Sequence, residues 1–116
     1  MDTIINNSIS IEDFQKIEIK VGQILEVEKV PETDKLLKLK VDFAEEKPRQ
    51  IISGIAHYFP DFPILINQKC MFVTNLKARI IKGLESNGMI LAISTDDGKF
   101  SLMKPNNEIP NGSLVK

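Results

Sequence analysis

The stretch IEIKVGQILEVEKV, residues 17–30, carries the strongest fold signal in the chain. Apolar residues occupy most of its odd positions and charged residues most of its even positions, which is the period of a strand with one buried face. A glycine inside such a strand, here Gly22, indicates a bulge or a sharp bend. A strand that bends near its middle can serve two faces of a small barrel. The side chains expected to face inward are Ile17, Ile19, Val21, Leu25 and Val27.

The same period recurs in shorter segments along the chain. The sequence LLKLKVDF places Leu37, Leu39, Val41 and Phe43 on one face and charged side chains on the other. We therefore expect a series of half-buried strands separated by polar turns. The expected strands are residues 17–30, 36–43, 49–55, 69–76, a fifth that begins near residue 88 after a loop, and short ones at 99–103 and 113–116.

Three other segments have local signals of their own. Ser10 with Asp13 three positions later resembles a capping box, which predicts a short helix over residues 11–16. Residues 56–68 contain two prolines and are expected to be irregular, with one helical turn. The Asp-Gly pair within residues 95–99 predicts a hairpin turn.

Five strands with an extra element between the third and the fourth are the layout of an OB-fold. The sequence therefore predicts an all-β protein, a five-stranded OB-fold barrel. A short N-terminal helix, a short helical turn between strands three and four, and short extra C-terminal strands complete it. Residues 1–10 are expected to form a flexible N-terminal segment, and residues 11–116 a single domain.

The composition argues against several classes of protein. The formal net charge of −1 argues against a protein that coats nucleic acid without specificity, but it leaves room for a local basic face. One cysteine, Cys70, and one histidine, His57, are too few for a zinc site, which needs about four ligands. No third group is indicated that would orient them as a catalytic pair. We therefore expect no enzyme activity, no catalytic residue, no metal and no cofactor.

The chain also lacks the signals of a membrane or exported protein. No apolar run approaches the ~20 residues that a membrane helix needs. The first ten residues have neither the basic region nor the apolar region of a signal peptide. A cytoplasmic protein without membrane contact is expected.

Three ordered blocks resemble the tRNA-binding domain family. They are DFQKIEIKVGQILEVEKVPETDKLLKLKVD (13–42), RQIISGIAHYFP (49–60) and NLKARIIKGLESNGMILAIS (75–94), and the resemblance runs from about residue 11 to residue 115. This OB-fold module occurs at the C-terminus of many methionyl-tRNA synthetases and in stand-alone dimeric tRNA-binding proteins. The resemblance implies a non-catalytic protein or synthetase-associated module that recognises tRNA by shape and backbone. It also implies a homodimer, with the methionyl-tRNA synthetase catalytic subunit as a further partner.

A bacterial export chaperone shares this fold, so the alternative function is a chaperone or protein-interaction scaffold. In that branch the blocks DKLLKL and NLK…SNGM are altered. Here both stand in the form that resembles the synthetase branch. This favours tRNA binding.

The polar residues that follow the fourth strand are the first candidates for RNA contact. Lys77, Arg79 and Lys82 lie within one loop and could neutralise adjacent phosphates, although a solvated loop would look the same. The resemblance places Asn75, Lys77, Ser86 and Met89 on the RNA face. For Met89, packing in the core is an equally good interpretation.

Strands two and three add further candidates, because they form the usual ligand face of an OB-fold. Lys35 opens strand two and Lys38 projects from its outer face, while Arg49 begins strand three and Ser53 ends it. An ordinary polar strand face or an ion pair to glutamate would explain the same residues. The full set of RNA-binding candidates is Lys35, Lys38, Arg49, Ser53, Asn75, Lys77, Arg79, Lys82, Ser86 and Met89.

The two ends of the chain are expected to lie near a dimer interface. They carry apolar residues beyond those that the strands need, and a symmetric dimer would combine two weak RNA faces through effective concentration. These residues are Ile4, Ile5, Ile9, Leu102 and Met103.

Overall fold

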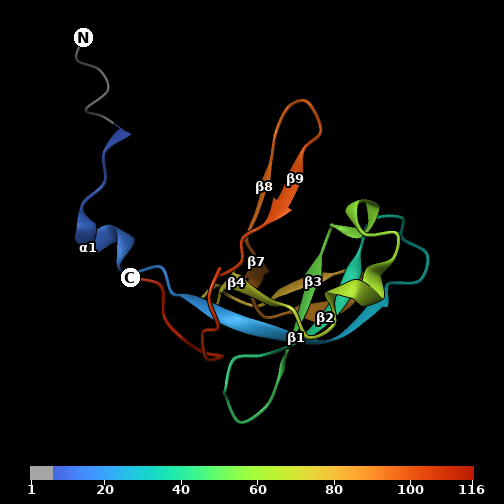
Figure 1. Cartoon of the computed structure of the whole chain (residues 1–116), viewed down its shortest axis with the longest axis horizontal. Coiled ribbons are helices and arrows are strands. Elements are labelled where there is room, and N and C mark those ends of the chain that lie inside the picture. The colour runs from blue at the N-terminus through green and yellow to red at the C-terminus, as the bar shows by residue number, and fades with distance from the viewer. Residues whose placement is uncertain (1–6) are drawn as a thin grey trace.

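Strand β1, Ile19–Lys29, is the longest element of the computed structural model, which describes residues 7–116. Its second half pairs with β2, Leu37–Asp42, and its first half with β4, Lys69–Val73, both antiparallel (Figure 1). A Cβ on Gly22 would lie 2.5 Å from the ring of Phe43 and 2.6 Å from Val41. Glycine is therefore the residue that lets the end of β2 pack against β1 at this point.

A register shift in β1 changes which residues face the core. The shift lies between Ile24 and Glu26, where Leu25 is the extra residue of a bulge. Ile24 is fully buried and Leu25 only half-buried, so the expected inward position of Leu25 is wrong. Val21 is buried, and its backbone bonds to the C-terminal segment: its N–H donates to the Ser113 carbonyl, and its carbonyl accepts from the Gly112 N–H.

The first positions of the quoted stretch also depart from the expectation. Ile17 precedes the strand and is 46% exposed, and Ile19 is half-buried. Val21 and Val27 are buried as expected, and Val27, beyond the bulge, lies in the core cluster. The alternation was correct in period, but the bulge moves the core position from Leu25 to Ile24, and Ile17 and Ile19 are less buried than expected.

The main sheet has the strand order β3-β2-β1-β4-β7, with β3 at Arg49–Ser53 and β7 at Met89–Ile90. Its two edges meet through a few hydrogen bonds. The Asn87 N–H donates to the Gln50 carbonyl at 2.9 Å, and the Ile52 N–H donates to Ser86 Oγ at 2.9 Å. These contacts nearly close the five strands into a barrel, as the OB-fold prediction requires.

The barrel interior is filled by the apolar face of β2 and its neighbours. Leu37, Leu39 and Val41 are completely buried and Phe43 almost so, which confirms the inward face predicted for this strand. Phe43 packs edge-to-face on Phe72 of β4, with ring centroids 5.2 Å apart.

The connection between β3 and β4 has more helical structure than expected. Two 3₁₀ turns, η2 at Ala56–Tyr58 and η3 at Phe62–Leu65, replace the single turn predicted there. The second has a proline in its first turn, where the fixed φ favours a helical start. Leu65 anchors the segment by entering the core.

Helix α1, Ile11–Phe14, has the predicted cap but is shorter than the predicted range. Ser10 Oγ accepts from the Asp13 N–H at 3.0 Å. The Phe14 and Gln15 N–H groups reach back four residues, to the Ser10 and Ile11 carbonyls, but those of Lys16 and Ile17 reach back only three, to Asp13 and Phe14. The helix therefore tightens and ends before residue 16.

The loop expected before the fifth strand is a β-hairpin, formed by β5 at Arg79–Ile81 and β6 at Leu84–Ser86. Its two turn residues, Lys82 and Gly83, both have positive φ, 51° and 79°. This is the conformation of a type I′ turn, whose twist suits a two-residue hairpin.

The predicted Asp-Gly hairpin is confirmed. It joins β8, Ala92–Ser94, to β9, Phe100–Leu102, and projects from the barrel in Figure 1. The expected strand at 113–116 is reduced to one bridge, between Lys20 and Leu114, with flanking backbone bonds.

Helix α1 and the C-terminal residues lie close together beside the start of β1 (Figure 1). The flexible segment predicted for residues 1–10 falls mostly outside the described residues, and so do Ile4 and Ile5.

Candidate nucleic-acid interface

The segment from Asn75 to Met89 holds three exposed cations on the hairpin and the loop before it. Lys77 precedes β5, Arg79 begins it and Lys82 forms its turn. None of the three has an ion-pair partner among residues 7–116. Cationic side chains held on a short hairpin without a carboxylate partner are well suited to contact phosphates.

Asn75 has a different role in the fold. Its Oδ1 accepts from the Glu18 N–H at 2.9 Å, and its Nδ2 donates to the Lys16 carbonyl at 2.6 Å. The amide therefore ties the end of β4 to the chain entering β1. In this position it supports the loop that carries Lys77.

Ser86 and Met89 differ in how deeply they are buried. Ser86 is 4% exposed, and its hydroxyl accepts from Ile52 and donates to the Gly88 carbonyl at 3.3 Å, so it belongs to the barrel seam. Met89 is 45% exposed, while the next residue, Ile90, enters the core. The interpretation of Met89 as a core residue is therefore wrong.

Each guanidinium nitrogen of Arg49 is bonded to a protein group. Its Nε and Nη2 donate to the two carboxylate oxygens of Glu45 at 2.9 and 2.7 Å. Its Nη1 donates to the carbonyls of Thr74, at 2.6 Å, and Asn87, at 3.2 Å. The guanidinium also lies 5.3 Å from the Phe43 ring centroid. Arg49 therefore links β3 to both ends of the basic segment.

Two carboxylates belong to the same network. The Arg49 guanidinium lowers the pKa of Glu45 from its ordinary value, and the Thr74 hydroxyl, 2.6 Å from Glu18 Oε1, lowers the pKa of Glu18. Glu45 in turn raises the pKa of Arg49. The sequence offered no signal for these pairs beyond the Glu45–Arg49 spacing, because Glu18 and Thr74 are 56 residues apart.

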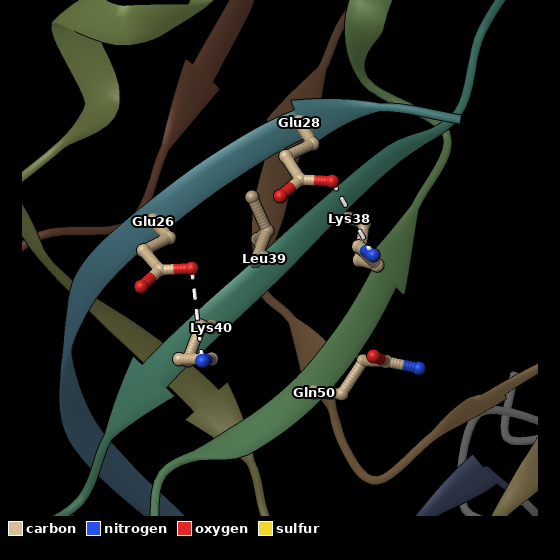
Figure 2. Close-up of a pocket in the computed structure, with 6 residues that line it drawn as sticks. All are labelled: Glu26, Glu28, Lys38, Leu39, Lys40 and Gln50. Carbon is tan, nitrogen blue, oxygen red and sulfur yellow. Dashed lines mark ion pairs between the residues drawn. The ribbon is translucent and has the colours of Figure 1, made fainter. Parts of the chain in front are cut away.

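The outer face of β1 and β2 is neutralised by alternating charges. Figure 2 shows Glu28 paired with Lys38, at 3.3 Å, and Glu26 paired with Lys40, at 3.6 Å, around a shallow hollow. The charge of Lys38 is therefore shared with a carboxylate on the neighbouring strand. This face offers less attraction for phosphate than its lysines suggested.

Lys35 and Ser53 lie at the far end of the β2–β3 pair from Arg49. Lys35 is exposed just before β2, and Ser53 is half-buried opposite Leu37. Ser53 lies four positions along the strand from Arg49, a distance of about 13 Å. Ser53 follows Ile52, whose N–H bonds to Ser86 Oγ, so this end of β3 lies next to the end of β6.

A separate apolar groove of about 420 Å³ lies between α1 and the chain end. Its apolar lining residues are Ile11, Phe14, Ile17, Leu114 and Val115, all at least partly exposed.

Of the apolar residues expected at a dimer interface, Ile9 is exposed and Met103 is half-buried. Leu102 is 7% exposed and belongs to the core cluster, so its expected role as a spare apolar residue is wrong.

Comparison with protein families matches residues 19–114 to the family described as "Putative tRNA binding domain". That range covers all of the barrel and the basic hairpin. This chain belongs to the tRNA-binding domain family.

Curated relatives of this tRNA-binding domain include methionine–tRNA ligases. The enzyme from Lactococcus lactis is 45% identical over 108 residues, which are 92% of this chain and 16% of the enzyme. The one from Parabacteroides distasonis is 44% identical over 113 residues. The chain therefore spans about one sixth of the length of these relatives.

Solved structures similar to the domain include a synthetase-related protein and a chaperone. A MetRS-related protein from Pyrococcus horikoshii has a TM-score of 0.86 and 38% identity, over 95% of this chain and 99% of that one. The chaperone CsaA from Bacillus anthracis has a TM-score of 0.82 and 26% identity, over 94% of this chain and 99% of that one.

Side chains that could supply chemistry are sparse in the described part of the domain. Residues 7–116 hold no group of three or more histidine, cysteine, aspartate or glutamate side chains that could bind a metal ion. Cys70 is fully buried, and burial raises the pKa of its thiol to about 11. Within the same residues, no helix has the length and apolar character to span a membrane.

Proposed function

We propose that this chain is a non-catalytic tRNA-binding module that serves a methionyl-tRNA synthetase, as a separate subunit or as part of a longer polypeptide. The proposal rests on the exposed cations of the β5–β6 hairpin and of the loop before it. Among residues 7–116, no carboxylate forms an ion pair with them. Membership of the family and 45% identity to a methionine–tRNA ligase support it. Recognition rests on the shape and backbone of tRNA.

The candidates divide into direct contacts and supports. Lys77, Arg79, Lys82 and Met89 are exposed and form the proposed contact surface, with Lys35 as a separate phosphate contact. The supports, Asn75, Arg49 and Ser86, have their polar atoms bonded to protein and position the contact surface. Lys38 and Ser53 make a lesser contribution.

The test is tRNA binding by the purified protein across a salt series. About four or five phosphate contacts give a log–log salt slope of about −3 to −4. Lys77→Ala should weaken binding and reduce the slope by about 1. Lys99→Ala, on the β8–β9 hairpin and paired with Asp97, is the matched control and should leave the slope unchanged. Absence of tRNA binding at low salt would overturn the proposal.

The functional unit that we infer is a cytoplasmic homodimer. The groove beside α1 supports this inference because it exposes a cluster of apolar side chains that a second copy would cover. Two RNA faces in one dimer can engage a single tRNA, so that their affinities combine through effective concentration.

The second candidate function is an export chaperone or protein-interaction scaffold. The same apolar groove and the likeness to the chaperone CsaA favour it. Binding of unfolded polypeptide in such a groove would persist at high salt, whereas tRNA binding would be lost. A protein that suppresses aggregation at high salt and fails to bind tRNA would establish this alternative.

A further inference from the structure

Ile80, in the middle of β5, is 70% exposed, more than any other large apolar side chain among residues 7–116. Lys77 and Arg79 precede it and Lys82 follows it, all within three residues, or about 10 Å of extended chain. An isolated exposed isoleucine is ordinary on a protein surface. Its position among cations that lack a carboxylate partner is not explained by packing.

The pairing of the hairpin determines what Ile80 can contact. Arg79 pairs with Ser86, whose hydroxyl is bonded into the barrel seam, so this pair lies next to the barrel while the Arg79 side chain stays exposed. Ile80 pairs with Glu85, and successive strand residues alternate between faces, so this pair lies on the opposite, solvent side. The carboxylate of Glu85 beside Ile80 disfavours a phosphate at Ile80 itself. The neighbouring cations can instead hold the phosphates before and after that position.

An apolar side chain flanked by phosphate contacts matches the chemistry of an unstacked nucleotide. Single-stranded loops and ends expose base faces that apolar and aromatic side chains can cover, while a continuous duplex hides them. We propose that Ile80 packs against the base of an unstacked nucleotide in a loop or at an end of the RNA, while Lys77, Arg79 and Lys82 hold the neighbouring phosphates. The inference rests on the tRNA-binding function proposed above.

The experiment compares the wild type with Ile80→Thr, which keeps a β-branched residue suited to the hairpin and removes the apolar surface. Affinity is measured for tRNA and for a blunt RNA duplex of similar length, each across a salt series. Ile93→Thr is the matched control, because Ile93 is 53% exposed on the other hairpin. We expect Ile80→Thr to weaken tRNA binding about five- to tenfold, since apolar burial is lost, with an unchanged salt slope. Duplex binding and the control variant should match the wild type.

The outcomes separate this inference from the proposed function. Wild-type tRNA affinity in Ile80→Thr, or an equal loss for tRNA and duplex, overturns the contact between Ile80 and an unstacked base while tRNA binding itself stands. A reduced salt slope also overturns it, because the variant would then have disturbed the cations. Failure of the wild type to bind tRNA at low salt overturns the proposed function, and the inference with it.

Discussion

At the scale of single residues, a basic side chain near the RNA surface has two distinct uses. Lys77 is exposed and has no ion pair within residues 7–116, whereas every donor group of Arg49 faces a protein acceptor. Both looked alike in the sequence, as cations at strand ends. The difference lies in the acceptors that the fold brings to each.

Arg49→Lys should lower the free energy of unfolding by about 1–3 kcal/mol, because lysine cannot make the paired bonds to Glu45 and also reach two carbonyls. Urea unfolding measures this. Lys47→Ala, an exposed lysine in the preceding turn, should change stability by less than about 0.5 kcal/mol. An unchanged stability with a salt slope of tRNA binding reduced by about 1 would instead make Arg49 a phosphate contact.

Glu45 and Glu18 make stability depend on pH in the acid range. Their folded pKa values lie below the ordinary value of 4.5, so the unfolded chain binds protons first as pH falls. Their contribution is present above about pH 4.5 and is lost as pH falls through the lowered pKa values.

Urea unfolding between about pH 7 and about pH 3 should show this loss, and Glu45→Gln should make the profile shallower. Glu46→Gln is the control, since Glu46 is exposed and has no ion pair among residues 7–116. A Glu45→Gln profile as steep as that of the wild type would show that the Arg49 bond does not contribute to acid stability.

At the scale of secondary-structure elements, β1 organises the barrel because it pairs with β2 and β4 along different halves. Gly22 and the bulge at Leu25 lie where the two pairings meet. The strand must bend there, and the neighbouring end of β2 packs directly over the glycine.

Gly22→Ala should lower the free energy of unfolding by about 1–3 kcal/mol, because its methyl group would overlap Phe43 and Val41. Gly54→Ala is a matched control, since a Cβ there would meet only the Lys35 carbonyl at 4.0 Å, and it should change stability by less than about 1 kcal/mol. Thermal and urea unfolding of both variants measure the difference. Equal effects would mean that the close approach of β2 is not a constraint.

At the scale of the whole molecule, the basic hairpin and the apolar groove are separate surfaces that can act together. One basic face with about four or five phosphate contacts binds weakly, and a second copy through the groove would double the contacts. The charge of −1 is consistent with this arrangement, because the cations are concentrated locally and elsewhere paired with carboxylates.

Leu114→Glu should convert the proposed dimer to a monomer, because it places a charge in the apolar groove. The affinity for tRNA should fall by about 10²-fold as the second face is lost. Sedimentation equilibrium gives the oligomeric state, and Ile93→Glu, an exposed position outside the groove, should stay dimeric. A monomeric wild type at concentrations that saturate tRNA would refute the dimer.

The sequence by itself determined what depends on near neighbours. The alternation in β2 predicted its buried face, the Ser10–Asp13 spacing predicted the cap, and the Asp-Gly pair predicted the β8–β9 hairpin, because strand faces, caps and tight turns are set within a few residues. The family resemblance, also a property of ordered sequence blocks, was confirmed over residues 19–114.

Only the tertiary structure decided the phase of β1, the use of each cation and the exposure of Ile80. The bulge at Leu25 depends on pairing with β2, and the two carbonyl acceptors of Arg49 lie 25 and 38 residues along the chain. Local patterns do not encode which distant groups a fold brings within hydrogen-bond distance. Whether a cation near the surface stabilises the fold or stays available for binding depends on those distant partners.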